Sequence, residues 1–131
     1  MLRSLDYVYM PSADPDADAR RWVETLGAEP VWKIRRFGTV VACLRVSDAG
    51  PAVILAGHLE GNLPILVYRV DDLTEAVASL RAAGLDVHEF GLPPGPAARA
   101  DAPGGQPFAV YELTRPGRVE SFAGRFDEPE E

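Results

Sequence analysis

Two amphipathic helices with the same pattern constrain the fold of this chain more than any other feature of its sequence. Apolar residues recur at positions i, i+3, i+4 and i+7 in both segments, with charged or small residues between them. This spacing places four apolar side chains on one face of a helix, so each helix is expected to bury that face. The apolar positions are Ala19, Trp22, Val23 and Leu26 in the first helix and Leu73, Ala76, Val77 and Leu80 in the second.

The two helices also share their start and stop signals. Each begins after an aspartate, Asp14 or Asp72, whose carboxylate is suited to cap the free N–H groups of the first turn. Each ends at a glycine, Gly27 or Gly84, the residue that most readily adopts the left-handed conformation at a helix C-terminus. The two aspartates lie 58 residues apart and the two glycines 57. A nearly constant separation with matching ends indicates that one structural unit occurs twice.

Short strand-like segments surround each helix in the same order. One segment precedes the helix and three follow it, and most are rich in β-branched, aliphatic or aromatic residues. The order is therefore β-α-β-β-β, twice, which predicts the α+β class. The expected strands are 5–10, 30–36, 39–46 and 52–56 in the first unit and 65–70, 86–90, 107–113 and 118–122 in the second.

The length of 131 residues suits a single domain. This domain is expected to cover residues 1–124, with unit one at about 4–57 and unit two at about 64–123. The acidic residues at 125–131 predict a frayed tail. Residues 92–105 are rich in Pro, Gly and Ala, which predicts a long loop that is either a flap over a pocket or disordered.

Charge and cysteine content limit the classes of partner and the compartment. The formal net charge is −7, which argues against nucleic acid or an anionic membrane surface, because both attract basic patches. No stretch approaches the roughly 18 apolar residues of a membrane-spanning helix. Cys43 is the single cysteine, so no intrachain disulfide can form. Together with an N-terminus that has no apolar signal core, this predicts a cytoplasmic protein.

Several short motifs, in their order and spacing, resemble the vicinal oxygen chelate superfamily, which includes glyoxalase I, extradiol dioxygenases and bleomycin-resistance-type binding proteins. The resemblance implies that the two units form an open, cup-shaped mixed sheet with the helices on its outer face. It also implies a small-molecule pocket in the cup and a homodimer. The motifs that carry it are Tyr7–Met10 with Asp14, Thr25–Glu29, Val70–Leu73 with Leu80–Leu85, and Arg115–Glu120.

Metal-dependent members of that superfamily bind a divalent ion through His, Gln or Glu side chains at four strand positions. Carried over by the resemblance, these positions fall at Tyr7, at Ile65, within residues 53–56 and at Glu120. A metal site that a substrate can chelate needs about three fixed protein ligands. Because only Glu120 is an ordinary ligand type, the resemblance implies a degenerate site with no metal ion and no other cofactor. An alternative ligand set would combine Glu120 with Glu112 or His58.

Strand alternation assigns the side chains that would line the cup if Tyr7 points into it. Strands 31–36 and 107–113 leave the choice of face open. Aromatic and aliphatic walls with few polar groups are typical of a site for a flat, largely apolar organic molecule. Glu120 is the candidate catalytic residue. The expected ligand-binding residues are Tyr7, Tyr9, Trp32, Ile65, Val67, Arg69, Phe108, Tyr111 and Phe122.

These features favour a small-molecule-binding protein of the glyoxalase and bleomycin-resistance type, whose ligand is a planar antibiotic or secondary metabolite. Three alternatives remain open. The first is a metal-free isomerase, lyase or cyclase that uses Glu120 or Tyr7 as its acid–base group. The second is a divalent-metal-dependent lyase or dioxygenase. The third is a structural or regulatory domain without a small ligand.

Overall fold

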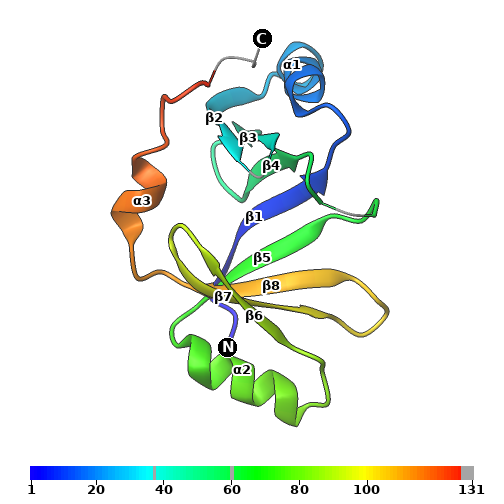
Figure 1. The fold of residues 1–131 in the computed structure, drawn as a ribbon, viewed down its shortest axis with the longest axis vertical. Helices are drawn as coiled ribbons and strands as arrows, with labels where there is room; N and C mark the ends of the chain where they lie inside the picture. The colour runs from blue at the N-terminus through cyan, green and yellow to red at the C-terminus, as the bar shows by residue number, and fades with distance from the viewer. Residues whose placement is uncertain (37, 60, 128–131) are drawn as a thin grey trace.

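The computed structural model describes residues 1–36, 38–59 and 61–127, and the side chains of Arg36, Val119 and Glu120 also lie outside the described part. Eight strands form one mixed sheet in the order β2-β3-β4-β1-β5-β8-β7-β6. The α+β class and the open sheet expected from the sequence are confirmed (Figure 1). The strands are β1 (Ser4–Pro11), β2 (Glu29–Arg36), β3 (Thr39–Arg45), β4 (Ala52–Ala56), β5 (Ile65–Val70), β6 (His88–Leu92), β7 (Gly95–Asp101) and β8 (Pro107–Glu112).

The two halves of the sheet are joined by an antiparallel pair of strands at its centre. Tyr7 of β1 lies opposite Val67 of β5, and Tyr9 lies opposite Ile65. Each of these strands also pairs in parallel with the last strand of its own half, β1 with β4 and β5 with β8. Both halves therefore contain the same arrangement, and β1 and β5 cross the middle of the molecule between them (Figure 1).

Helices α1 (Pro15–Leu26) and α2 (Leu73–Ala82) begin as the capping signals predict. The Asp14 carboxylate accepts a hydrogen bond from the Ala17 N–H at 3.1 Å, and the Asp72 carboxylate accepts one from Glu75 at 3.0 Å. These bonds satisfy first-turn donors that have no partner within the helix. In the described part of the chain, no helix combines the length and apolar composition that crossing a membrane requires.

Each helix packs on the outer face of its own half of the sheet. Helix α1 contacts β2, β3 and β4, and helix α2 contacts β7 and β8. The apolar face of α1 is narrower than its sequence predicts, because Leu26 is 59% exposed and Val23 lies at the edge of the buried area. Its contact with the sheet is made by Ala19 and Trp22.

Residues 92–105 do not form the long loop that their composition predicts. They supply the end of β6, all of β7 and a turn before β8, so that β6 and β7 make an antiparallel hairpin. The composition of this segment is explained by close packing. Ala97 and Ala98 are completely or almost completely buried, and a Cβ atom on Gly95 would lie 1.9 Å from the Glu112 carbonyl oxygen. Small residues are required where the strand passes this close to its neighbour.

The segment 118–122, expected as the last strand, is not a strand. Residues Pro116–Glu120 form the short helix α3, and the last strand of the second half is β8. Because the hairpin already supplies β6 and β7, the second half is complete without a further strand. Pro116 starts the helix without loss, since a first-turn residue needs no N–H donor. The carboxylate of Glu120 was expected on this strand and lies outside the described side chains.

The described part of the expected acidic tail, residues 125–127, lies along the edge strand β2. Lys33 of β2 donates its N–H to the Arg125 carbonyl at 2.8 Å and accepts a hydrogen bond from the Asp127 N–H at 2.8 Å. Gly124 donates to the Val31 carbonyl at 2.9 Å. The chain thus leaves β8 in one half, passes through α3 and attaches to the free edge of the other half (Figure 1).

Candidate functional site

The central strands divide their side chains between the helices and the inner face of the sheet, which we call the cup. On the cup side, Tyr7 and Tyr9 of β1 pack between the two inner apolar clusters. The cup-side positions of Tyr7, Tyr9, Ile65 and Val67 agree with strand alternation. The remaining inner residues of these clusters are Trp32, Ile34, Val41, Cys43, Ile54, Ala56, Leu59, Leu92, Ala97, Ala109, Tyr111 and Phe122, with Val31 and Ala52 at the margin.

The structure shows which faces of β2 and β8 line the cup, a choice that the sequence leaves open. On β2, Trp32 and Ile34 face the cup. On β8, Ala109 and Tyr111 face it, whereas Phe108 packs on the opposite face with the apolar side chains of α2. The expectation that Phe108 lines the pocket is therefore wrong, because the alternation of β8 places it one residue out of phase with Tyr111.

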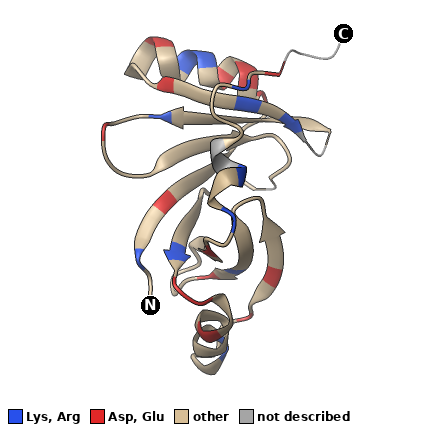
Figure 2. Ribbon diagram, turned by 90° about the vertical axis from the view of Figure 1, so that its left-hand side faces the viewer, with Lys and Arg blue, Asp and Glu red and all other residues tan. Residues whose placement is uncertain are grey.

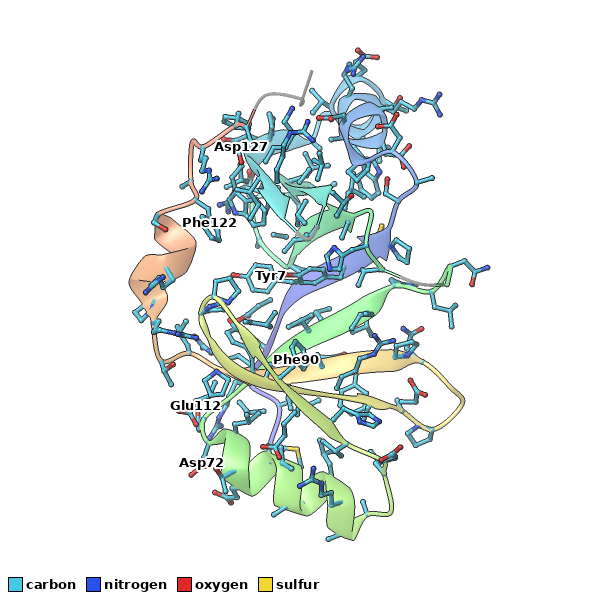
Figure 3. All side chains as sticks on the ribbon, in the orientation of Figure 1. Tyr7, Asp72, Phe90, Glu112, Phe122 and Asp127 are labelled. Carbon is cyan, nitrogen blue, oxygen red and sulfur yellow. The ribbon has the colours of Figure 1, made fainter. Side chains whose placement is uncertain are left out.

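The cup contains an apolar cavity of about 220 Å³, which we call the main cavity. Its walls come from β1 to β4 of the first half, and it is covered by the turn of the β6–β7 hairpin and by Phe122. Figure 3 shows Tyr7 in the middle of the molecule, with Phe90 on the hairpin and Phe122 on the C-terminal segment. The lining residues are Tyr7, Tyr9, Trp32, Ile34, Val41, Ile54, His58, Phe90, Gly91, Leu92, Pro93, Pro94 and Phe122.

A second cavity of about 220 Å³ adjoins the main cavity on the side of the second half. The two cavities share Tyr9, His58, Phe90 and Leu92, so these four residues lie where the cavities meet. The cup therefore offers one continuous inner surface. The second cavity adds Leu59, Ile65, Val67, Arg99 and Ala109 to its lining.

Aromatic rings meet at both ends of this surface. The ring centroids of Trp32 and Phe122 lie 5.5 Å apart, with their planes at 63°. Those of Tyr7 and Tyr111 lie 6.2 Å apart, with their planes at 50°. Tilted and edge-to-face pairs of this kind are the arrangement that aromatic quadrupoles favour. The rings consequently present fixed apolar walls to a molecule in the cup.

A polar cluster around Asp6 lies beside Tyr7 and Tyr111. The Asp6 carboxylate accepts a hydrogen bond from the Tyr111 hydroxyl and another, at 2.5 Å, from the Ser4 hydroxyl. Simple alternation from Tyr7 would place Asp6 on the helix side. The pairing of β1 with β5 shifts register between Leu5 and Tyr7, and this irregularity allows Asp6 to reach a cup-side residue. No signal in the sequence indicates the shift.

Both tyrosine hydroxyls of this cluster stay protonated at physiological pH. Burial raises the pKa of Tyr7 to about 12, with smaller contributions from Cys43 and Asp6. Burial also raises the pKa of Tyr111, and the hydrogen bond to Asp6 raises it further. In each case the charged phenolate would lose hydration or meet a carboxylate, so the neutral form is favoured. Tyr7 is therefore a hydrogen-bond donor towards the cup and not a base.

Of the other predicted ligand-binding residues, Phe122 lines the main cavity and Arg69 lines neither of the two cavities. Arg69 is the pairing partner of Tyr111 on β8 and of Ser4 on β1, so it lies at the end of the cup beside the Asp6 cluster. Phe122 lines the main cavity although it belongs to no strand. Sequence reasoning missed Leu92 because residues 92–105 were expected to form a loop, and it missed Phe90 because no face of the expected strand 86–90 was assigned to the cup. The alternation of Phe90 and Leu92 at the end of β6 is the signal that could have identified them.

The described side chains of the cup do not make up the donor set of a divalent metal ion, since His58 is the one imidazole that lines its cavities. The inner side chains of β1, β4, β5 and β8 are tyrosine, isoleucine, valine and alanine, with Arg69 at one end. Among the described residues, no group of three or more His, Cys, Asp or Glu side chains could hold a metal. Tyr7, with its raised pKa, does not supply a phenolate. The carboxylate of Asp6 is a single oxygen-donor group, whereas such sites use about three ligands.

Comparison with known proteins gives similarity at the level of the fold. No family model matches the sequence, and no curated protein matches it either. Among solved structures, a methylmalonyl-CoA epimerase from Mycobacterium tuberculosis superposes with a TM-score of 0.73 at 20% identity, over 90% of this chain and 93% of that one. A Streptomyces coelicolor methylmalonyl-CoA epimerase in complex with 2-nitronate-propionyl-CoA gives 0.70 at 17% identity, over 87% and 99%. A catechol 2,3-dioxygenase gives 0.64 at 17% identity, over 87% of this chain and 42% of that one.

Proposed function

We propose that this chain, which has the fold of the vicinal oxygen chelate superfamily, binds a flat and largely apolar organic compound in its cup without a metal ion. The ligand class we propose is an antibiotic or a secondary metabolite. The observation that carries the proposal is the lining of the main cavity, in which Tyr7, Tyr9, Trp32, Phe90 and Phe122 supply aromatic walls. Pockets for drug-sized molecules have this mostly apolar and aromatic character.

The size of the cup supports a ligand of two or three rings. A cavity of roughly 150 Å³ is enough to hold one benzene ring. The main cavity and the adjoining cavity each measure about 220 Å³, and they share four lining residues. A multi-ring compound can therefore extend from Trp32 past Tyr9 towards Val67. The hydroxyl of Tyr7 offers a hydrogen-bond donor along this path, because its raised pKa keeps it protonated.

Metal independence follows from the donor set. The superfamily resemblance implies ligands at Tyr7, at Ile65, within 53–56 and at Glu120. The first three positions supply only a protonated phenol and aliphatic side chains, so Glu120 would be the single ordinary ligand of the four. The same proposal includes a homodimer and a cytoplasmic location. The homodimer is proposed from the resemblance, and the location is proposed from the lone Cys43.

One experiment tests binding and metal independence together. Trp22 packs under α1, away from the cup, so the Trp22→Phe variant leaves Trp32 as the single tryptophan. N-phenyl-naphthylamine, a neutral two-ring fluorophore with an attached phenyl group, is titrated into this variant. We expect quenching of Trp32 emission, a rise in probe fluorescence and a micromolar dissociation constant that a chelator leaves unchanged. No quenching, or binding that the chelator abolishes, would overturn the proposal.

A metal-free acid–base enzyme is the second candidate, and the Asp6 cluster is the observation that favours it. The Asp6 carboxylate, which hydrogen bonds from Tyr111 and Ser4 hold beside the cup, would be the group that accepts a proton from the substrate. The epimerases among the similar structures suggest methylmalonyl-CoA as the substrate to assay. This candidate requires epimerisation that persists with a chelator and falls at least about tenfold in Asp6→Asn. Loss in Glu120→Gln instead would assign the role to Glu120, and the absence of turnover removes the candidate.

A further inference from the structure

We propose that the ligand of the cup carries an anionic group, such as a carboxylate, sulfonate or phosphate, which Arg115 and Arg118 bind at the rim beside Phe122. This inference rests on the proposed binding function, because it describes the polar end of a ligand whose apolar body occupies the main cavity. It adds a chemical class that the aromatic walls alone do not define.

A basic hollow of about 310 Å³, formed at the start of α3 and the tip of the β6–β7 hairpin, adjoins the main cavity. The two spaces share Gly91, Leu92, Pro93 and Phe122, so the ring of Phe122 stands between the apolar walls on one side and the guanidinium groups on the other. An elongated ligand can therefore keep its rings in the main cavity and reach the hollow with one substituent. The hollow adds Arg115, Arg118 and Ser121 to the shared residues.

The position of Arg115 is fixed by the hairpin that covers the cup. Its backbone N–H donates to the Pro94 carbonyl at 2.8 Å, and one of its terminal nitrogens donates to the Leu92 carbonyl at 2.9 Å. A guanidinium has five N–H donors in a planar fork, so this single carbonyl leaves most of them for another acceptor. Both anchor residues line the main cavity. The same backbone that shapes the apolar site thus orients a cation at its edge.

Arg118 lies one turn further along and completes a pair. The Arg118 N–H donates a hydrogen bond to the Arg115 carbonyl at 3.1 Å. This bond forms the turn at the start of α3 and holds the backbone of Arg118 close to that of Arg115. In Figure 2, which looks at the side of the molecule where α3 lies, basic segments follow one another on α3 and in the chain leading to it. Two guanidinium groups lining one hollow suit an anion with two or three oxygens.

The net negative charge of the chain makes a pair of arginines in one hollow unexpected. The chain carries 20 acidic and 13 basic residues, so a hollow chosen without regard to function would more often contain a carboxylate than two arginines. The described side chains that line the hollow include both arginines and no carboxylate. Such a local excess of positive charge attracts an anionic ligand and steers it towards the mouth of the cup.

A pair of matched probes tests the inference. Anilinonaphthalene sulfonate and N-phenyl-naphthylamine share the same aromatic body, and only the first carries an anionic group. Both are titrated into the full chain, into Arg118→Gln and into Arg115→Gln/Arg118→Gln. The measured quantity is the ratio of the two dissociation constants for each variant. The single variant is included because the hydrogen bonds from this segment to the hairpin are, among the described residues, made by Thr114 and Arg115, so replacing Arg118 leaves the anchoring of Arg115 in place.

We expect the sulfonate to bind at least about fivefold more weakly to Arg118→Gln, and more weakly still to the double variant, while binding of the neutral probe changes less than about twofold. The penalty should shrink at high ionic strength, because partly exposed charges are screened. Arg20→Gln/Arg21→Gln, on the exposed outer side of α1, makes the same change in net charge and should leave both constants unchanged.

Two outcomes overturn the inference and separate it from the proposed function. If both probes bind in the cup and the arginine variants do not change the ratio, the anionic subsite is wrong and the binding function stands. If Arg99→Gln, in the adjoining cavity, weakens the sulfonate instead, the anionic group is bound at the other end of the cup. Failure of the neutral probe to quench Trp32 counts against the proposed function itself.

Discussion

The indole ring of Trp32 and the phenyl ring of Phe122 meet edge to face, with centroids 5.5 Å apart, although they come from β2 and from the segment after α3. This contact is where the end of the described chain reaches the main cavity. The following residues continue along β2 and hold Phe122 in place through backbone hydrogen bonds to Val31 and Lys33. The C-terminal segment therefore forms one wall of the candidate site.

Replacing Phe122 with alanine should remove that wall. We expect the neutral naphthylamine probe to bind about tenfold more weakly, because a large aromatic contact with the ligand and with Trp32 is lost. The free energy of unfolding should fall by about 1–2 kcal/mol, since Phe122 is only partly buried. Phe126→Ala is the matched control on the same segment: Phe126 is 47% exposed and does not line the cup. Equal effects of the two variants on binding would contradict the role given to Phe122.

The attachment of the C-terminal segment to β2 should depend on the charge of Asp127. Its carboxylate accepts hydrogen bonds from the Arg125 guanidinium at 2.8 and 2.9 Å and from the Arg35 N–H at 3.0 Å, and these lower the pKa of Asp127 to about 2. Because the pKa of Asp127 in the folded state lies below its ordinary value of 3.8, the stabilisation is present above about pH 4 and is lost as the pH falls towards 2.

The Asp127→Asn variant should therefore unfold at a lower urea concentration than the wild type at pH 7, and the difference should shrink as the pH is lowered from 4 towards 2. Asp48→Asn, on the exposed turn between β3 and β4, removes the same charge without these bonds and serves as the control. A difference between Asp127→Asn and the wild type that is independent of pH would show that the ionised carboxylate is not the stabilising group.

Local signals in the sequence are the ones that predict structure here. The caps at Asp14 and Asp72 and the alternation that points Tyr7 and Tyr9 into the cup depend on residues a few positions apart, and they lead to the correct helices and central strands. The repeat of these signals is what gives the overall topology. The fold class and the main wall of the cavity could therefore be predicted from the sequence alone.

The remaining features depend on contacts between distant segments. The Pro-rich start of β7 has the composition of a loop. It is a strand because Gly95 leaves room for the Glu112 carbonyl, which lies where a Cβ atom on Gly95 would be. The strand expected at 118–122 is displaced because β8 completes the second half, and α3 follows instead. Asp6 reaches Tyr111 because the register between β1 and β5 shifts at this point, and the sequence of β1 contains no signal that predicts the shift. These errors explain why Leu92, Arg115 and Asp6 were missed as site residues.

Gly95 should be the most sensitive position of the hairpin. A Cβ atom there would lie 1.9 Å from the Glu112 carbonyl oxygen, so alanine can be accommodated only if β7 moves away from β8. We expect Gly95→Ala to lower the free energy of unfolding by about 1–3 kcal/mol and to weaken probe binding, because the hairpin turn lines the main cavity. Gly117→Ala, in α3, meets no atom within 4 Å and should be tolerated. A hairpin that accepts alanine at position 95 without loss would contradict this packing.

The buried tyrosines should make the protein sensitive to alkali. The pKa of Tyr7 is raised to about 12, and that of Tyr111 is raised too, so both are protonated in the folded state at a pH where the unfolded chain begins to ionise. A group with a raised folded pKa contributes stability that is present below its unfolded pKa, near 10, and is lost as the pH rises towards the folded value.

We therefore expect the urea midpoint of the wild type to fall between pH 10 and 12, and we expect the Tyr7→Phe variant to lose part of this dependence. The phenyl ring retains the packing against Tyr111 but cannot ionise, so at pH 8 the variant should be within about 1 kcal/mol of the wild type. Ultraviolet absorbance of tyrosinate provides an independent measurement, because the Tyr7 and Tyr111 signals should appear only together with unfolding. Tyr68→Phe, on the helix-facing side of β5, is the control. Ionisation of all four tyrosines near pH 10 in the folded protein would show that the hydroxyls in the cup are open to solvent.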